Sequence, residues 1–212
     1  MSPSQRRPAA KSDRRITADP TRARILQSAL ESFARNGFHG TSTRMIASLA
    51  GISPGAVYVH HQSKEELLFQ LSLEGHQEAL DVVVAAAAAA TPEQAPGDRL
   101  AVVMADFAAW HARRHTIARV VQYELAALTA EHHAVIAKVR RRTRDVVRGI
   151  VDDGIRTGEF EVDKPDLATV ALLSLGIDVA RWYRPGAWTP EEIGRYYADL
   201  ALHVVRHRPA DK

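Results

Sequence analysis

Hydrophobic residues recur with the period of an α-helix along most of the chain after residue 20. Between Thr21 and Asn36 they form a single stripe made of Ile25, Leu26, Ala29, Leu30 and Phe33. Asn36-Gly37 is expected to end this first helix, because glycine readily adopts the left-handed conformation of a helix C-cap. No segment alternates between apolar and polar residues as a half-buried strand does. The pattern therefore predicts an all-α fold.

Capping residues and prolines divide the rest of the chain into further helices. Start signals stand at Ser42, at Ser53-Pro54, at Ser63 with Glu66, and at Thr189 with Glu192. Pro-Gly pairs at 96–97 and 185–186 mark breaks. The prediction is about nine helices, over residues 21–36, 42–50, 53–60, 63–90, 98–114, 116–129, 131–157, 165–184 and 190–206.

The two short helices around residue 51 have the packing residues of a helix-turn-helix between Thr43 and His60. Gly51 tolerates the positive φ of a tight turn, and Ala47 is small where the helices cross. A mini-core would come from Ile46, Ile52 and Val57. The second helix then leaves for DNA the residues Ala56, Tyr58, Val59 and His60. The alternative is an ordinary corner between two helices, which uses the same small and apolar residues.

Positive charge is concentrated in the first third of the chain. Residues 1–64 hold ten basic and three acidic residues, a net of +7, whereas residues 65–212 hold 18 basic and 22 acidic residues, a net of −4. Such asymmetry is typical of a polyanion-binding module joined to a neutral or acidic domain. We therefore expect a disordered basic arm over residues 1–20, a DNA-binding domain over 21–66, and a second domain over 67–208.

The sequence lacks the signals that are typical of several classes of protein. The chain has no cysteine, so disulfides and thiolate chemistry are excluded. The apolar run Val82 to Ala90 is shorter than the roughly 20 residues that cross a bilayer, and no secretory signal precedes it. We expect a cytoplasmic, nucleoid-associated protein without a membrane segment. Because no catalytic motif or phosphate-binding glycine loop appears, we expect neither an enzyme nor a cofactor.

Histidines offer one alternative, a metal sensor. His111 and His115 stand four residues apart, a spacing that can place two imidazoles on one metal ion, and His132-His133 follow. No third ligand is placed by the sequence, so no metal site is predicted.

The region from residue 21 to 68 resembles the DNA-binding domain of TetR-family regulators. The resemblance rests on matched positions in order: Arg24-Ile25-Leu26, Phe33, Gly37-Phe38, Thr41-Ser42-Thr43, Ile46-Ala47, Ala50-Gly51-Ile52-Ser53, Gly55, Val57-Tyr58, His60 and Ser63-Lys64-Glu65-Glu66-Leu67. It implies phosphate contacts from Thr41, Tyr58, His60 and Lys64, and base-edge contacts from Arg44, Pro54, Gly55 and Ala56. Thr43 and Ser53 complete the expected DNA-binding set. The chain departs from the family at His61, where an aromatic residue, commonly phenylalanine, is usual.

The last two predicted helices suit a dimer interface. The segment 165–184 is apolar on nearly every side and 190–206 carries an apolar stripe, which favours a self-complementary four-helix contact between two copies. The resemblance to the TetR family implies dimerisation at the same place, and hence a pseudo-palindromic operator.

An effector pocket is expected between these helices and the fourth one. The candidate ligand-binding residues are Phe107, Trp110, His111, Tyr123, Arg181 and Trp182. Several segments, among them Tyr123-Glu124-Leu125 and Arg181-Trp182-Tyr183, are similar to the TetR subgroup that includes acyl-CoA-responsive repressors of lipid and steroid catabolism. That similarity implies a lipophilic effector such as an acyl-CoA or an aromatic acid, whose anionic groups Arg119, Arg181 and Arg184 could meet. The run Arg140 to Arg144 is either a second polyanion patch or a solvated helix face.

Three functions follow from these features. The first is a repressor that a small molecule releases from its operator. The second is an architectural DNA-binding protein without an effector, and the third an enzyme built on the C-terminal domain.

Overall fold

In the computed structural model, residues 19–89 and 94–206 are described, and over these ranges the chain forms α-helices, one short 3-10 turn and no strand. The predicted all-α fold is confirmed. The helices are α1 (Pro20–Gly40), α2 (Thr43–Ala50), α3 (Pro54–His60), α4 (Lys64–Ala89), α5 (Pro96–Arg113), α6 (His115–Tyr123), α7 (Ala130–Thr157), α8 (Pro165–Trp182) and α9 (Pro190–Val204), with the 3-10 turn η1 (Leu125–Ala127) between α6 and α7. The expected arm lies outside the described residues except for Asp19 and Pro20.

Side-chain caps begin the helices where the sequence indicates. Ser42 Oγ accepts the N–H of Met45 at 3.2 Å, and Ser53 Oγ accepts that of Ala56 at 3.2 Å. The capping box of α9 is complete, since Thr189 Oγ1 accepts the N–H of Glu192 while the Glu192 carboxylate accepts the N–H of Thr189. These caps supply partners for backbone groups that a helix end leaves unpaired.

Three helix boundaries differ from the prediction. The segment 116–129 is not one helix, because Leu128 and Thr129 are extended and Thr129 instead caps α7 through the N–H of His132. Helix α5 begins at Pro96 rather than residue 98, since proline is tolerated in the first helical turn. Gly37 has the expected positive φ of 69°, but the chain continues as a further helical turn to Gly40.

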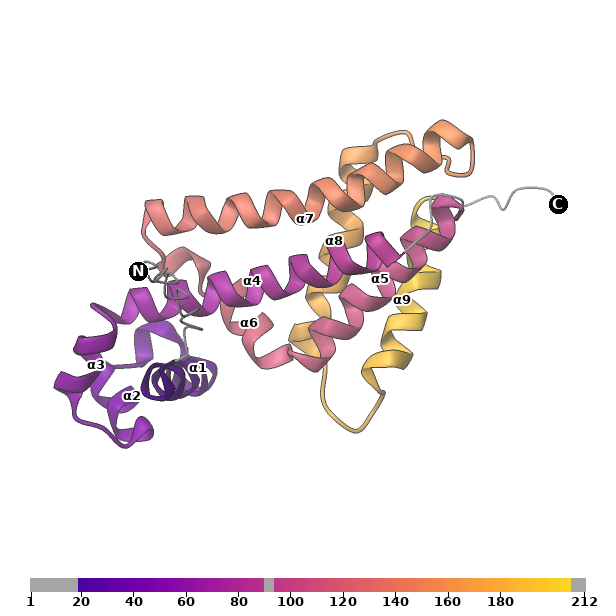
Figure 1. Ribbon diagram of the computed structural model, residues 1–212. Coiled ribbons are helices and arrows are strands. Elements are labelled where there is room, and N and C mark those ends of the chain that lie inside the picture. The colour runs from indigo at the N-terminus through magenta and orange to yellow at the C-terminus, as the bar shows by residue number, and fades with distance from the viewer. Residues whose placement is uncertain (1–18, 90–93, 207–212) are drawn as a thin grey trace, which may run out of the picture.

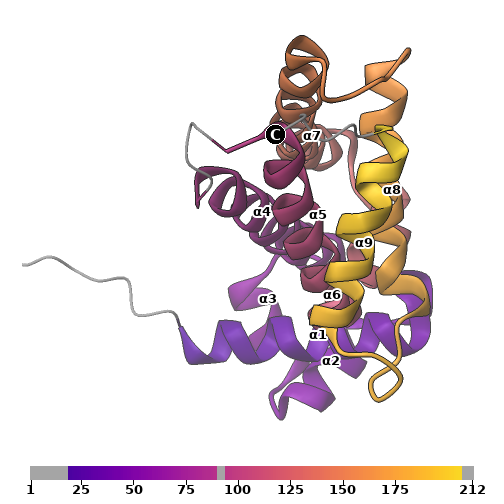
Figure 2. The same ribbon diagram turned by 90° about the vertical axis from the view of Figure 1, so that its right-hand side faces the viewer.

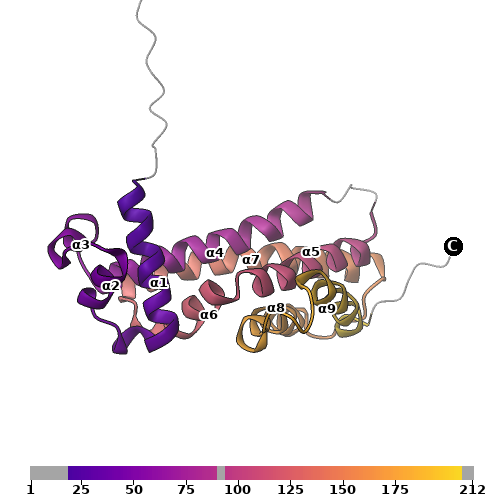
Figure 3. The same cartoon turned by 90° about the horizontal axis from the view of Figure 1, so that it is seen from below.

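The first three helices form one end of an elongated molecule, and α4 runs from them into the larger helical body (Figures 1 and 3). Helix α7 lies beside α4, and both begin at the end that carries α1–α3 (Figure 1). Helix α6 packs against α1 and α4, so its residues Ile117, Val120 and Val121 belong to the same buried cluster as Ile25 and Phe33. The cores of the two parts are therefore in direct contact.

Helices α8 and α9 lie side by side on one face of the larger body (Figure 2). Close packing holds them on α5: a Cβ at Gly194 of α9 would lie 2.7 Å from the carbonyl oxygen of Ala105, and one at Gly176 of α8 would lie 2.6 Å from the Phe107 ring. Leu167, Trp188 and Tyr196 remain 60% or more exposed. No helix in the described ranges is both long enough and apolar enough to traverse a lipid bilayer.

Candidate DNA-binding and effector sites

Helices α2 and α3 are joined by a tight turn and share a small core. Gly51 has φ 66° and ψ 36°, the left-handed conformation expected there. Ile46 and Ala47 are fully buried and Val57 is 1% exposed. The predicted helix-turn-helix is therefore present in the structure, with the packing residues in their expected places.

The outer face of α3 is open to solvent. Pro54, Gly55 and Val59 are exposed, and Tyr58 is 53% exposed. The Tyr58 hydroxyl lies 3.1 Å from Thr43 Oγ1, so a hydrogen bond ties the outer faces of α3 and α2. Arg44 is exposed on α2. A short helix with exposed hydrogen-bond donors, held by a second helix, is typical of a recognition helix that enters the major groove of DNA.

Two of the residues expected at phosphates, Thr41 and Lys64, have partners within the chain. Thr41 is 3% exposed, and its hydroxyl donates to the carbonyl oxygen of Ser32 at 3.0 Å or of Gly37 at 2.8 Å. Lys64 Nζ donates to the carbonyl oxygens of Phe38 at 2.6 Å and Thr41 at 2.7 Å, and it lies 4.2 Å from the centre of the Phe38 ring. Both residues thus hold the segment between α1 and α2 in the free chain, and their phosphate contacts stay a prediction.

The end of α3 is held by two neighbouring histidines in different ways. His60 Nδ1 lies 3.1 Å from a carboxylate oxygen of Asp19, the residue that caps α1. His61 is only 1% exposed, and neither ring nitrogen has a hydrogen-bond partner among the described groups. Burial, and then the positive charge of Arg22, lowers the pKa of His61. The neutral imidazole therefore takes the place of the family's aromatic ring in the core.

The six residues expected to bind an effector do not line one cavity. Phe107, Trp110 and His111 are at most 6% exposed and fill the core. Tyr123 and Arg181 border a cavity of about 190 Å³ between α6 and α8. Trp182 lies instead in a separate hollow of about 390 Å³ with Trp188, Tyr196 and Tyr197. The Phe107 ring packs directly against Gly176 of α8, where a Cβ would lie 2.6 Å from it.

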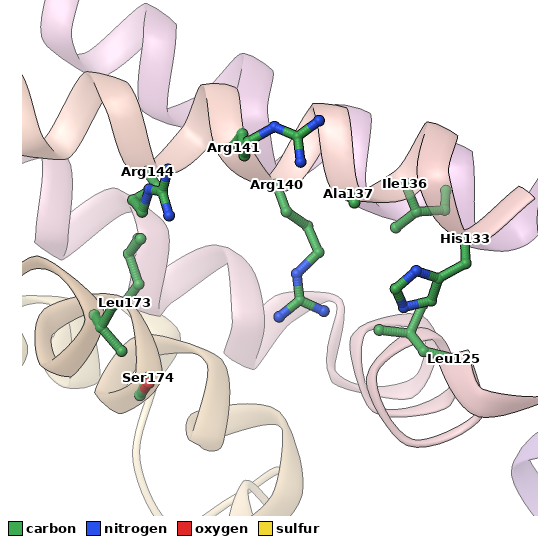
Figure 4. A pocket seen from close by; sticks show the side chains of 10 residues that line it. Leu125, His133, Ile136, Ala137, Arg140, Arg141, Arg144, Leu173 and Ser174 are labelled. Carbon is green, nitrogen blue, oxygen red and sulfur yellow. The ribbon is translucent and has the colours of Figure 1, made fainter. Parts of the chain in front are cut away.

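A larger cavity, about 470 Å³, lies between α7 and α8 next to η1. Its polar lining comes from Arg140, Arg141, Arg144, His133 and Ser174, and its apolar lining from Leu125, Ile136, Ala137, Val170 and Leu173. Arg140 extends from α7 into the space between the helices (Figure 4). None of the lining residues is acidic.

Arg140, Arg141 and Arg144 are all exposed to solvent in the single chain. Burial lowers the pKa of the Arg140 guanidinium, and its closest polar partner is Gln122 Oε1, 3.4 Å from Nη1. Arg144 lies 3.8 Å from Asp145, while Arg140 and Arg141 have no ion pair within the described ranges. The sequence signal for this site was the arginine run itself, but only the packing of α8 opposite α7 shows which arginines face a cavity.

His111 and His115, the two histidines considered for metal binding, each have a ring nitrogen close to a backbone carbonyl oxygen. His111 Nδ1 lies 2.8 Å from the Phe107 carbonyl oxygen and His115 Nδ1 lies 3.0 Å from that of Ala112. Within residues 19–89 and 94–206, no group of three or more His, Asp or Glu side chains is arranged to hold a metal ion.

Comparison with known proteins agrees with this architecture. A model of bacterial regulatory proteins of the tetR family matches residues 25–71, and one of a tetracyclin repressor-like C-terminal domain matches residues 93–205. The transcriptional repressor KstR2 of Mycobacterium tuberculosis is 31% identical over 195 residues, which are 85% of this chain and 90% of KstR2.

Solved structures share the fold over nearly the whole chain. A tetR-family regulatory protein from Rhodococcus RHA1 has a TM-score of 0.84 at 41% identity, covering 91% of this chain and 100% of its own. AibR, solved with isovaleryl coenzyme A and operator DNA, has a TM-score of 0.77 at 22% identity and covers 89% of this chain and 100% of its own, a likeness of fold. The two family models include both the helix-turn-helix and the arginine-lined cavity, and the chain belongs to the TetR family of DNA-binding transcriptional regulators.

Proposed function

We propose that this regulator is a dimeric repressor that an acyl-CoA thioester releases from a pseudo-palindromic operator. The observation that supports this class of effector is the cavity between α7 and α8. Its lining combines three arginines with apolar side chains and contains no acidic residue. Guanidinium groups bind phosphates through charge-assisted hydrogen bonds. An amphiphile with a polyanionic head and an acyl chain matches both parts of the lining.

The choice of a CoA thioester over an aromatic acid rests on charge. One carboxylate would leave most of the charge of Arg140, Arg141 and Arg144 unneutralised, whereas the phosphates of coenzyme A engage several arginines at once. AibR, a protein of the same fold, was solved with isovaleryl coenzyme A, so the fold is compatible with such a ligand.

DNA binding is assigned to α3 with support from α2. Pro54, Gly55 and Ala56 begin α3 and, with Arg44 of α2, would meet base edges, while Tyr58 would meet a phosphate. His60 would exchange its Asp19 partner for a phosphate. Thr43 holds Tyr58, and Ser53 caps the helix, so both act by positioning.

Dimerisation is assigned to α8 and α9. The side chains of Leu167, Trp188 and Tyr196 are 60–69% exposed and lie on α8, on α9 or in the loop between them. Large apolar side chains left exposed on these elements favour contact with a second copy. In a dimer of this kind, the two α3 helices can reach successive major grooves.

Release requires that the effector change the position of α3. Helix α7 carries the arginines, and its first turn is bound to the first turn of α4 through His132 and Glu65. Helix α4 in turn holds the segment between α1 and α2 through Lys64. An effector that shifts α7 relative to α8 therefore favours a different placement of the DNA-binding helices.

The experiment is an operator-release titration. DNA selected by the protein from genomic fragments is labelled, and release is measured by fluorescence anisotropy with CoA thioesters of increasing chain length, free coenzyme A, the free fatty acids and aromatic acids. The variant Arg140→Ala/Arg144→Ala should bind DNA normally and require at least about tenfold more thioester, because each lost charged hydrogen bond weakens the effector complex. Arg142→Ala, exposed on the same helix and outside the lining, is the matched control.

The outcomes separate the alternatives. Release by an aromatic acid, but by no thioester, would show that the effector is an aromatic acid and not a CoA thioester. Absence of any release or thermal stabilisation across the panel would favour an effector-independent architectural protein, and turnover of a bound ligand would favour an enzyme.

A further inference from the structure

The cavity of about 190 Å³ between α6 and α8 adjoins the larger, arginine-lined cavity of about 470 Å³. Ser174 of α8 lines both of them. Arg140 lines the larger cavity, and its Nη1 lies 3.4 Å from Oε1 of Gln122, which lines the smaller one. The two spaces are therefore separated by one side-chain contact between α7 and α6, with Ser174 as a common wall.

The contact between Arg140 and Gln122 can open without any change in the packing of the helices. An N–H···O hydrogen bond is normally about 2.9 Å long, so a bond of 3.4 Å is a weak one. Both side chains are long and rich in rotamers, and Arg140 reaches its position from α7 across the space between the helices (Figure 4). A ligand held in the larger cavity therefore has a route into the smaller one.

The smaller cavity combines an apolar wall with an ion pair that is already complete. Ala118, Ile177 and Ala180 supply the apolar wall. Asp178 is the acidic residue of this lining, and Arg181 donates to both of its carboxylate oxygens, from Nε at 2.6 Å and from Nη2 at 2.8 Å. The charge of Asp178 is therefore matched within the lining.

Arg119 is the second arginine of this lining, and it has no such partner. Its side chain is half-buried, and within residues 19–89 and 94–206 it forms neither an ion pair nor a hydrogen bond. Gln122 and Tyr123 add an amide donor and a hydroxyl donor to the same wall. The lining thus has one positive charge in excess, beside groups that donate hydrogen bonds to an anion.

We infer that the smaller cavity is a subsite for a carboxylate at the far end of the effector's acyl chain, and that Arg119 is the residue that binds it. The inference rests on the proposed function, because it takes the phosphates of the thioester to bind at the exposed arginines of the larger cavity. The acyl chain then passes between Arg140 and Gln122 and lies along Ile177. Arg119 stands three residues before Gln122 on α6, so the chain reaches it after roughly 5 Å along that helix.

Other chain ends fit this lining less well. A methyl end leaves the Arg119 guanidinium without a counter-ion in a partly buried site. A hydroxyl end offers a hydrogen bond but no charge, and an ammonium end adds a second unmatched positive charge. A carboxylate accepts two hydrogen bonds from the planar guanidinium and neutralises it. The subsite therefore selects the thioester of a dicarboxylic acid over the fatty acyl thioester of the same length.

The experiment compares thioesters that differ only at the far end of the chain. Half-maximal release from operator DNA is determined for hexanoyl-, octanoyl- and decanoyl-CoA, and for adipyl-, suberyl- and sebacyl-CoA, which have the same chain lengths. At one length or more, the carboxylated thioester should act at a concentration at least about tenfold lower, the effect of one charge-assisted pair of hydrogen bonds. The melting temperature with each thioester, measured without DNA, gives the same comparison for binding alone.

Three variants assign the preference to Arg119. In Arg119→Gln the ratio of the two concentrations should fall to about one, while the concentration required of the fatty acyl thioester stays within about twofold. Arg119→Lys keeps the charge but loses the planar fork, and should keep part of the preference. Arg142→Gln, the matched control, removes the same charge from an exposed position outside both linings and should leave the ratio unchanged.

A separate arm tests whether the carboxylate belongs to the thioester. Octanoyl-CoA is titrated in the presence of an excess of free adipate. No effect of adipate, together with the preference for suberyl-CoA, supports a single ligand that spans both cavities. If adipate lowers the concentration of octanoyl-CoA for release and Arg119→Gln removes that effect, the carboxylate comes from a separate acid and the spanning ligand is overturned.

The remaining results separate this inference from the proposed function. Equal potency of each matched pair on the natural chain overturns the inference alone, as does a preference that persists in Arg119→Gln. Failure of every thioester to stabilise or release the natural chain overturns the proposed effector class, and the inference with it.

Discussion

Glu65, in the first turn of α4, holds the first turn of α7 through His132, whose Nδ1 lies 2.8 Å from Glu65 Oε1. The same carboxylate oxygen accepts the backbone N–H of Thr129 at 2.9 Å, and the ring of Phe69 stacks on His132 at a centroid distance of 3.8 Å. Lys64, one residue earlier, binds the carbonyl oxygens of Phe38 and Thr41. Adjacent residues of α4 thus contact the effector-side helix and the DNA-binding domain.

Glu65→Ala should uncouple effector binding from DNA release. The variant loses the bonds to His132 and Thr129 but keeps the helix-turn-helix, so DNA affinity without effector should stay within about twofold. The effector concentration for release should rise about fivefold or more, the lower range of allosteric coupling. Operator-release titration measures both quantities. Glu131→Ala, an exposed acidic residue in the same turn of α7, is the control, and an unchanged release curve for Glu65→Ala would exclude this route.

His61→Phe should stabilise the protein. The imidazole is buried with both ring nitrogens unpaired, so an apolar ring of similar shape removes that cost. We expect an increase of about 1 kcal/mol in the free energy of unfolding, read from denaturant titration. A lower stability would show that His61 has a polar partner in solution.

Stability should fall in mild acid because of the buried histidines. Burial lowers the pKa of His76 and of His111 to about 4 each from 6.5. Between these values the unfolded chain binds more protons than the folded one, so stability is complete above about pH 6.5 and is lost as the pH falls toward 4. The melting temperature measured across this range should drop less steeply in His111→Leu. An equal slope in the variant would contradict the assignment.

Trp188→Ser/Tyr196→Ser should weaken dimerisation. Both side chains are at least 60% exposed in the single chain and border one hollow with Trp182. If α9 and the preceding loop contact a second copy, loss of two aromatic side chains should raise the dimer dissociation constant by at least about tenfold. Sedimentation equilibrium gives that constant. Val84→Ser, an exposed apolar residue on α4, should leave it unchanged.

The sequence predicted best those elements that are specified locally. Ser42, Ser53 and Thr189 accept backbone N–H groups within their own helices, as expected, and Gly51 adopts the left-handed turn. Such features depend on neighbouring residues, so periodicity and capping rules are sufficient. The end of α6 at Tyr123 was missed: Thr129, expected as the last residue of that helix, instead caps α7 and is held by Glu65, 64 residues away along the chain.

The effector site depended on packing that the sequence does not reveal. Helical periodicity places Arg140 and Arg144 on one face of α7, but a solvated face has the same pattern. Only the position of Leu173 and Ser174 on α8 shows that this face borders a cavity (Figure 4). Conversely, Phe107 and Trp110 are residues of the type that lines ligand pockets, yet their rings fill the core.

The central claim is that one chain both recognises an operator and is released from it by a CoA thioester. The most direct measurement is footprinting of the dimer on its selected DNA, with and without the thioester panel. The account predicts two protected half-sites related by a two-fold axis, with protection lost on addition of a thioester and retained when Arg140→Ala/Arg144→Ala is used at the same concentration. Protection that no thioester removes, or removal that is equally efficient with the variant, would contradict it.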